Sequence, residues 1–313
     1  MQKTVASLFR TLKRAEQLLT AALAISVLNL LGLLPVGPAM RFADSLARTV
    51  GPWLPRQRVA MANLARAFPD ISEAERLAIS RDMWVAMARL ATEYVFMEKL
   101  IGPVDPGRMP ERIEVEGVDI FLKMRDEGGP HIIFTAHIGN FEVLPIVASA
   151  YGLEVASLFR TPNNPYIARR LATARGARMG QLVPSGHGAA LTLTRILDNG
   201  GNVGMLVDQR FARGIEARFF GHPCDTNPLA AKLARRMDCP VHPARCVRLP
   251  DGRFRVEIFP ALTPPRDARG DIDIAAFTQM ITGIVEDWVR QTPGQWQWFH
   301  KRWKRGLRNR KKP

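Results

Sequence analysis

The stretch that decides the fold reads HIIFTAHIGNFE and covers residues 131–142. Its first six residues form a short apolar run that ends at Ala136, which is typical of a buried strand. Gly139 permits a tight turn, and a helix is expected to begin near Asn140. The stretch therefore predicts a strand, a loop and a helix in succession, which is the repeating unit of an α/β sheet.

The same alternation continues toward the C-terminus. Short apolar runs predict further buried strands, and amphipathic segments between them predict helices. Strands that alternate with helices indicate a mostly parallel central sheet covered on both faces. The expected strands are 131–136, 153–159, 181–184 and 202–208, and the expected helices are 140–151, 164–178, 187–198, 228–237 and 272–291.

Two more apolar runs, 240–249 and 253–260, flank Asp251-Gly252. Asp-Gly between two apolar runs is a strong hairpin pattern. We therefore expect a β-hairpin at the edge of the sheet.

Residues 38–101 read as helical, and the pattern Ser72-x-x-Glu75 predicts a capping box that opens a helix ending near Leu100. A segment rich in Pro and Gly follows at 103–110 and predicts a boundary. The chain is thus divided into an N-terminal anchor (1–37), a helical region (38–110), an α/β core (111–300) and a basic tail (301–313).

The run from Leu18 to Leu34 has no charged residue. As a helix it would measure roughly 26 Å, against about 30 Å for the hydrocarbon core of a bilayer. A buried helix and a cleaved signal peptide are alternatives, although no A-x-A-like cleavage site follows. We favour an anchor that is embedded in the membrane or lies on it. Basic residues occur on both sides of the run, so the charge rule gives no orientation.

The 313-residue chain has a formal net charge of +15, which indicates partners rather than a fold. Nucleic acid, an anionic membrane and an acidic or phosphorylated partner all fit such a charge. The cysteines are Cys224, Cys239 and Cys246, and this odd number argues against a disulfide framework. Free thiols suit the cytoplasm or a membrane face in contact with it.

His137 and Glu142 are the candidate catalytic pair. On one helix, residues five apart would face about 140° away from each other, so they can meet only if His137 lies in the loop and Glu142 in the first helical turn. A carboxylate beside a histidine favours one tautomer and stabilises the imidazolium, which makes the ring a general base. The alternative is a structural histidine at a strand end, because H-x-x-x-x-E is a weak motif by itself.

Several segments together resemble, in the same order, blocks of the lipid A late acyltransferases, within the wider lysophospholipid-acyltransferase group. The central segment, His137 to Glu142, is similar to H-x-G-N-W-E. The others resemble N-L-x-x-x-F-P, R-x-x-x-N-P, D-Q, V-x-F-F-G-x-x-A-x-T and P-x-Q-Y-x-W-x-H-x-R-W, and they lie at 63–69, 160–165, 208–209, 217–226 and 293–303. Two departures are Phe141, where Trp is usual, and Cys224, where Ala is common.

The resemblance implies a glycerolipid acyltransferase-like fold and transfer of a fatty acyl chain from acyl carrier protein to a hydroxyl of a lipid A precursor. It implies His137 as general base, Glu142 as its partner, and a location on the cytoplasmic face of the inner membrane. It implies no metal, nucleotide or flavin. Arg160 is expected to bind phosphate, and substrate contacts are expected at Asn140, Asn164, Asp208 and Gln209, although Asp208 and Gln209 equally suit loop capping.

Other interpretations remain open at this point. A lysophospholipid or a phosphoinositide glycolipid could be the acceptor instead. A non-catalytic basic adaptor at membranes or nucleic acid is a third hypothesis, although no nucleic-acid-binding module is recognisable. The histidines and cysteines at 222–246 could suggest zinc, but His242 and Cys246 would lie about 13 Å apart on one strand. No G-x-S-x-G motif supports a serine hydrolase.

Overall fold

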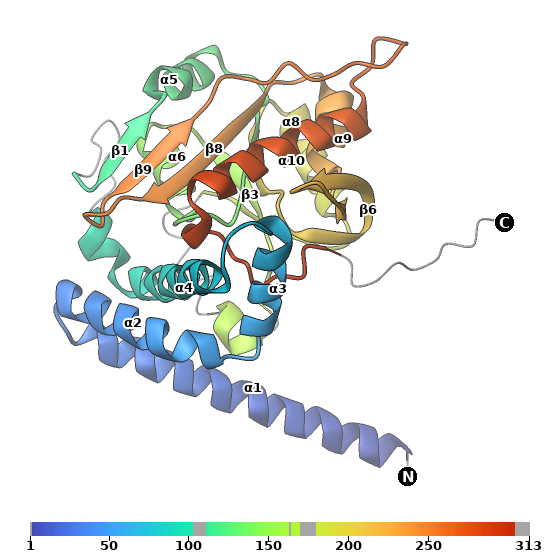
Figure 1. The fold of residues 1–313 in the computed structure, drawn as a ribbon. Helices are drawn as coiled ribbons and strands as arrows, with labels where there is room; N and C mark the ends of the chain where they lie inside the picture. Colours follow the sequence, from blue (N-terminus) through green and yellow to red (C-terminus); the bar gives the residue numbers. More distant parts are fainter. Residues whose placement is uncertain (1, 103–110, 163, 170–179, 304–313) are drawn as a thin grey trace.

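A computed structural model of the chain describes residues 2–102, 111–162, 164–169 and 180–303 (Figure 1). Its centre is a seven-stranded sheet with the strand order β1-β9-β8-β2-β5-β3-β4. Every neighbouring pair is parallel except β8 and β9, so the predicted mostly parallel α/β sheet is confirmed. The strands are β1 (Ile113–Glu116), β2 (Ile132–Thr135), β3 (Val155–Phe159), β4 (Leu182–Pro184), β5 (Asn202–Leu206), β8 (Val241–Arg248) and β9 (Phe254–Ile258).

The predicted hairpin is present, because β8 and β9 pair antiparallel on either side of Asp251-Gly252. Its predicted place at the edge of the sheet is wrong. The edge strand is β1, which pairs parallel with β9. This strand is only four residues long and carries two glutamates, so its sequence lacks the apolar run by which the other strands are recognised.

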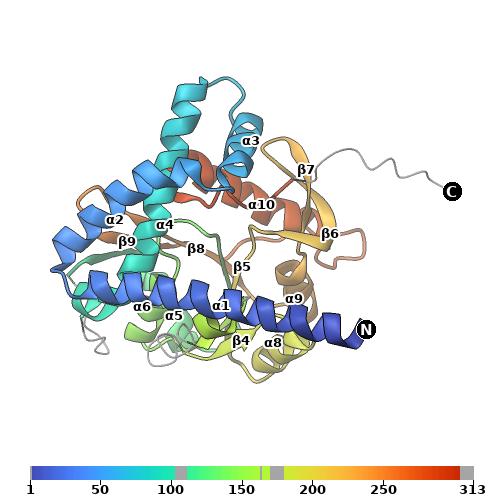
Figure 2. The ribbon, with the colours of Figure 1, turned by 90° about the horizontal axis from the view of Figure 1, so that it is seen from below.

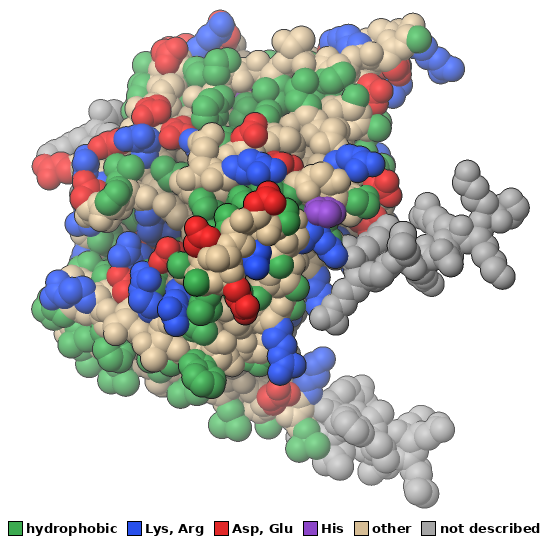
Figure 3. Space-filling view, viewed as in Figure 1, with side chains coloured by type: hydrophobic (Ala, Val, Ile, Leu, Met, Phe, Trp, Pro, Cys, Tyr) green, Lys and Arg blue, Asp and Glu red, His purple; other side chains and the backbone are tan. Residues whose placement is uncertain are grey.

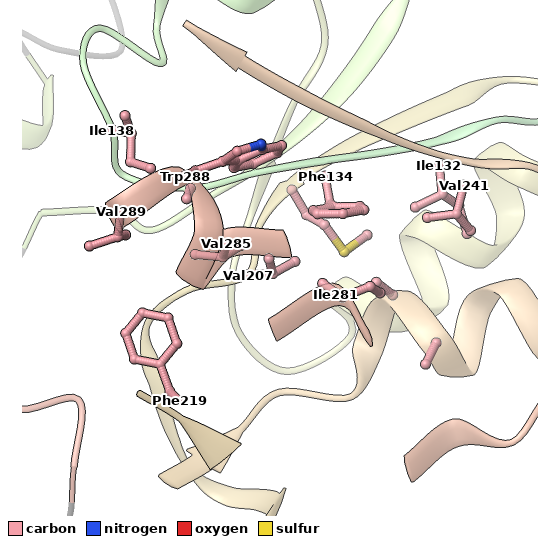
Figure 4. Close-up of a cluster of buried hydrophobic side chains, with 14 of the residues drawn as sticks. Ile132, Phe134, Ile138, Val207, Phe219, Val241, Ile281, Val285, Trp288 and Val289 are labelled. Atoms are coloured by element: carbon pink, nitrogen blue, oxygen red, sulfur yellow. The ribbon is translucent and has the colours of Figure 1, made fainter. Parts of the chain in front are cut away.

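Helices cover both faces of the sheet. On one face lie α5 (Val118–Glu127) and α6 (Val143–Ala150); on the other lie α8 (Ala189–Asp198), α9 (Leu229–Met237) and α10 (Ile274–Gln291). Alternate residues of β2 serve the two layers: Ile132 and Phe134 pack with α10, as Figure 4 shows, whereas Ile133 packs with the α5–α6 layer. The helices predicted at 140–151, 187–198, 228–237 and 272–291 are therefore confirmed. Part of the helix predicted at 164–178 lies outside the described residues.

A two-stranded antiparallel ribbon, β6 (Arg210–Phe219) with β7 (His222–Thr226), follows directly after β5. No such ribbon is predicted from the sequence, because most of β6 is exposed and neither strand has the apolar run of a buried strand. The ribbon matters for the site because it begins at Arg210, directly after Asp208 and Gln209 at the end of β5.

The N-terminal part of the chain is a layer of helices: α1 (Gln2–Gly32), α2 (Val36–Val50), the short 3-10 helix η1 (Gly51–Trp53), α3 (Gln57–Ala67) and α4 (Glu73–Ile101). The capping box of α4 is confirmed, since Ser72 N donates to Glu75 and Glu75 N donates to Ser72 Oγ. The segment Leu12–Gly32 is long and apolar enough to cross a membrane, by length and composition. Seen from below, α1 extends across the whole face of the molecule (Figure 2).

The boundary predicted at 103–110 and the tail beyond 303 lie outside the described residues. The first residues assigned to the tail are packed against the body of the protein. Arg302 is buried and donates to Asp225 O and Thr226 Oγ1, and Trp303 donates its indole N–H to Phe219 O.

Candidate active site

The loop after β2 is held in a shape that only glycine allows at its centre. Gly139 has a φ of +57°, and a Cβ there would lie 2.1 Å from the carbonyl oxygen of Cys246. Asn140 is fully buried: its amide donates to Glu93 on α4, and its carbonyl oxygen accepts from Glu142 N. Its side chain therefore shapes the loop, facing α4 rather than the pocket described below.

His137 is positioned by Asp208, which follows the adjacent parallel strand β5. Nδ1 of His137 lies 2.8 Å from Oδ1 of Asp208, and the backbone N–H of His137 donates to Oδ2 at 3.1 Å. The two residues meet because β2 and β5 are neighbours whose carboxyl ends lie at the same edge of the sheet. With its Nδ1 proton held by Asp208, His137 has Nε2 left as a proton acceptor.

Asp208 is 3% exposed and remains ionised because of its partners. Burial would raise the pKa of this carboxyl, but the charge of His137 and the hydrogen bonds from His137 and Trp296 outweigh burial and lower the pKa well below its usual range. The indole N–H of Trp296 donates to Oδ2 at 2.8 Å. A buried carboxylate of this kind can stabilise a positive charge on His137.

Gln209 lies between two histidines. Its Nε2 is 3.1 Å from Nε2 of His137 and 3.1 Å from Nε2 of His300. Nε2 of His300 is also 3.0 Å from Oε1 of Gln297, so this nitrogen accepts from Gln209 in one tautomer and donates to Gln297 in the other. Burial, followed by repulsion from His137, lowers the pKa of His300 to about 4, so this ring is neutral at neutral pH.

The predicted partner of His137, Glu142, lies at the start of the helix that follows the loop. Glu142 is the N-cap residue of α6, and it lines the same pocket as His137. The carboxylate that contacts Nδ1 of His137 is that of Asp208, and a pairing of Glu142 with His137 stays a prediction. Glu142 is near in sequence, but Asp208 is brought close by the β2–β5 pairing, which spacing along the chain does not reveal.

An apolar cavity of about 190 Å³ opens beside His137. It crosses the face of the sheet beneath α5 and α6, from β9 to β4. Polar residues at one part of its wall are His137, Glu142 and Arg160, whereas most of the wall is aliphatic and includes Leu144, Leu153, Val155, Leu158, Met205 and Ile258. Such a cavity suits a hydrocarbon chain whose reactive end lies at His137.

Arg160 and Asn164 follow the end of β3. Arg160 is exposed and lines the cavity, where a guanidinium can meet a phosphate or a carboxylate. Asn164 instead donates its amide to Gln17 O of α1 at 2.7 Å and accepts from Tyr166 N. The structure therefore gives Asn164 contacts within the protein, and a substrate contact there stays a prediction.

The closing segment 293–303 completes the site. Trp296 contacts Asp208, His300 contacts Gln209, and the amide of Asn63 on α3 donates to the carbonyl oxygens of Trp298 and His300. Neither Trp296 nor His300 is among the site residues predicted from the sequence, although both lie in the block that resembles the family's last motif. Their place in that block is the one signal in the sequence that could have identified them.

A buried ion pair fixes the site to the helical layer. Arg248 at the end of β8 donates twice to Glu93 on α4, at 2.7 Å each. Gln295 binds both the N–H and the carbonyl of Arg248, and its own carbonyl accepts from Gly139 N. The His137 loop, the closing segment and α4 therefore form one connected unit.

Within the described part of the chain, no three His, Cys, Asp or Glu side chains come together as metal ligands. Burial raises the pKa of Cys239 to about 11 and that of Cys246 to about 12, so both are protonated thiols in the interior.

The fold and the site together define a class: an α/β protein whose histidine–aspartate pair lies beside an apolar cavity at the carboxyl edge of a parallel sheet. The sequence model of the bacterial lipid A biosynthesis acyltransferase family matches residues 8–305. The chain belongs to this family.

Two curated proteins are similar to part of the chain. The lipid A biosynthesis myristoyltransferase of Escherichia coli (strain K12) is 26% identical over 125 residues, and the lipid A biosynthesis acyltransferase 1 of Shigella flexneri is equally similar. Each alignment covers 40% of this chain and 36% of the relative's length.

Proposed function

We propose that this protein transfers a fatty acyl chain from the thioester of acyl carrier protein to a hydroxyl of a lipid A precursor. The observation that carries the proposal is the ionised Asp208 on Nδ1 of His137, directly beside an aliphatic cavity. Family membership supports the acceptor class, and the net charge of +15 suits both an acidic carrier protein and an anionic membrane.

In the proposed reaction, the acyl chain occupies the cavity and its carbonyl lies near His137. Nε2 of His137 takes the proton from the acceptor hydroxyl while the hydroxyl oxygen bonds to the thioester carbon. The C–S bond then breaks, and the departing thiolate takes the proton back from the imidazolium. The products are the ester and the free thiol of the carrier.

Asp208 stabilises the imidazolium during this cycle and fixes the ring by its contact with Nδ1. Gln209 contacts Nε2, so the acceptor hydroxyl displaces that contact when it binds. Glu142 and Arg160 line the cavity beside His137, where we assign them to orienting the substrates; Arg160 suits a phosphate of the donor or the acceptor.

The test is acyl transfer by purified wild type and His137→Ala, with acyl carrier protein thioesters and the lipid A precursor, followed by mass spectrometry of the lipid. The proposal expects one added acyl chain with the wild type and none with a folded variant. Transfer by the variant at the wild-type rate would rule out His137 as the base. If the folded wild type acylates only a lysophospholipid or a phosphoinositide, the acceptor assignment is overturned while the mechanism survives.

A further inference from the structure

One face of α1 packs along the protein. Ala21 and Leu31 are buried, and Leu28 packs against the core beneath α5 and α6. Near the start of this packed stretch, the backbone oxygen of Gln17 accepts a hydrogen bond from the side chain of Asn164. At its end, Gly32 lies so close to α4 that an added Cβ would be 3.1 Å from Val95. Residues 17–32 therefore lie against the body of the protein over roughly 22 Å.

The opposite face of α1 is apolar and exposed. It carries Leu19, Leu23 and Leu30, whose exposed fractions are 71%, 69% and 64%, and Leu33, directly after the helix, is 81% exposed. A helix with a packed face and an equally apolar open face has the pattern of a helix that lies between protein and lipid.

The exposed apolar surface continues beyond α1. On α2, Phe42, Leu46 and Val50 recur every fourth residue and are all exposed, and Trp53 in η1 is 85% exposed. Figure 3 shows hydrophobic side chains along the lower edge of the molecule, over the region where Figure 1 places α1 and α2. An exposed patch spread over three elements, with a tryptophan at its end, marks a surface made for a partner.

Exposed basic side chains lie on both sides of the apolar segment of α1 along the chain. Lys13 and Arg14 lie before the apolar segment, and Arg41, Arg56 and Arg58 lie after it; all are exposed. A helix that crosses a membrane usually has its basic residues concentrated on one side. Basic residues at both ends fit a helix whose two ends face the same anionic leaflet.

We propose that α1 does not cross the bilayer. Instead α1, α2 and Trp53 lie together in the boundary between headgroups and acyl chains of one anionic leaflet, so that the protein is monotopic. The proposal goes beyond the reaction and does not depend on it, because the position of the chain in a membrane is measured without turnover.

Crossing is disfavoured by what packs against α1. If α1 stood perpendicular to the membrane and crossed a hydrocarbon core of about 30 Å, the parts of the protein packed against residues 17–32 would also enter that core. These neighbours include the side chain of Asn164 and helix α4, whose Arg89 forms an ion pair with Asp44 of α2. Polar and charged groups at that depth are costly. Lying flat leaves them in water and places the exposed leucines of α1 in lipid.

The first test is the location of the two ends of α1. Lys3→Cys and Gly37→Cys introduce one thiol before and one after the apolar segment; the wild type, whose three cysteines are buried, is the control. Each variant is expressed in a Gram-negative host and treated with a membrane-impermeant maleimide. We expect neither thiol to react in intact spheroplasts and both to react in inverted vesicles. Reaction of one thiol in spheroplasts would show that α1 crosses the membrane and would overturn the proposal.

The second test asks whether α2 enters the lipid. Binding to vesicles containing about one quarter phosphatidylglycerol is measured by flotation for wild type and Phe42→Glu/Leu46→Glu. We expect the double variant to bind at least about tenfold more weakly, because two large apolar side chains are lost from the lipid. Leu191→Glu is the matched control: Leu191 is also exposed, but it lies on α8, away from α1 in Figure 1.

An unchanged affinity of the double variant, at unchanged melting temperature, would exclude α2 from the membrane surface. If the double variant binds vesicles like wild type but dissociates from a dimer into monomers, the apolar face is an interface between copies of the chain, and the proposal fails.

Discussion

The indole N–H of Trp296 donates to Oδ2 of Asp208 at 2.8 Å, and the opposite oxygen of the same carboxylate lies 2.8 Å from Nδ1 of His137. Trp296, in the closing segment of the chain, thus fixes Asp208, and Asp208 in turn fixes the proposed base His137. Three parts of the sequence, at 137, 208 and 296, form one line of contacts from which the behaviour of variants can be derived.

Trp296→Phe removes that indole donor and keeps an aromatic ring. We expect kcat to fall roughly tenfold, because a hydrogen bond to a charged group contributes about 1.5–3 kcal/mol and its loss loosens Asp208. Trp288→Phe is the control, since Trp288 is also buried but packs with Phe134 and Phe259. Steady-state kinetics and melting temperatures of both variants separate the effects. Equal losses of kcat in the two variants would mean that the indole contact has no specific role.

Asp208→Asn keeps the shape of the side chain and removes the charge that stabilises the imidazolium. We expect kcat to fall by at least about 100-fold with little change in KM, because the contact acts on proton transfer rather than on binding. Asp225→Asn is the matched control: Asp225 is also buried, but its side chain pairs with Arg210. If a folded Asp208→Asn protein transfers rapidly and Glu142→Gln does not transfer, the residue that assists His137 is Glu142 rather than Asp208.

The assignment of that partner shows where reasoning from the sequence stops. The strands, the loop with Gly139 and the place of His137 follow from local patterns, since apolar runs and turn residues act over a few positions. The sequence also predicts that Asp208 lies at a strand end, in a D-Q pair. Its contact with His137 depends on β5 lying beside β2, and strand order is set by packing of the whole sheet rather than by any local pattern.

The same reason explains the other differences. Asp251-Gly252 predicts the hairpin, but its local pattern does not reveal that β1 pairs beyond it, because the short, acidic β1 carries no clear strand pattern. His300 and Trp296 reach the site from a distant segment, held there by Asn63 and Gln295. Contacts of this kind join residues more than 150 positions apart, so only the folded chain reveals them.

Acidification should destabilise the protein through His300. Its pKa in the folded state is about 4, whereas an unfolded histidine has a pKa of about 6.5. The unfolded chain therefore binds more protons between these values, and stability present above pH 6.5 is lost as the pH falls toward 4. The loss from this group is at most about 3 kcal/mol, or roughly 2–5 °C in melting temperature.

Melting temperatures of wild type and His300→Gln between pH 7.5 and about pH 4.5 test this linkage. The variant should show a smaller decrease on acidification, although not a flat profile, because burial also lowers the pKa of His131 and His242. Identical pH dependence in the two proteins would contradict the expected role of His300.

Gly139→Ala tests the shape of the loop after β2 that carries His137. The new Cβ would lie 2.1 Å from Cys246 O at a φ of +57°, so both the close contact and the backbone conformation oppose it. We expect a loss of stability of several kcal/mol and loss of transfer. In the control Gly270→Ala, φ is +83° but no atom lies within 4 Å of the new Cβ, so the cost should be about 1–2 kcal/mol of backbone strain. Equal stability of the two variants would show that the loop moves freely away from β8.

The cavity beside His137 can be narrowed at Gly204, which lies on β5 in its wall. A Cβ there would lie 3.1 Å from Val155 Cγ1 and 3.6 Å from Ser157 Oγ, so the side chain of Gly204→Val must extend into the cavity. If the acyl chain occupies this space, the variant should prefer donors with a shorter acyl chain. Each methylene contributes about 0.8 kcal/mol, so kcat/KM for a donor that is two methylenes longer should fall by roughly 10-fold or more relative to the shorter donor. Competition between acyl carrier protein thioesters of different length, read by mass spectrometry of the product, measures the ratio directly.

Gly201→Ala is the control for this cavity variant. Gly201 precedes the same strand but is not part of the cavity wall, and its new Cβ meets Ile196 instead. A length preference that stays the same in Gly204→Val while the overall rate falls would place the acyl chain elsewhere.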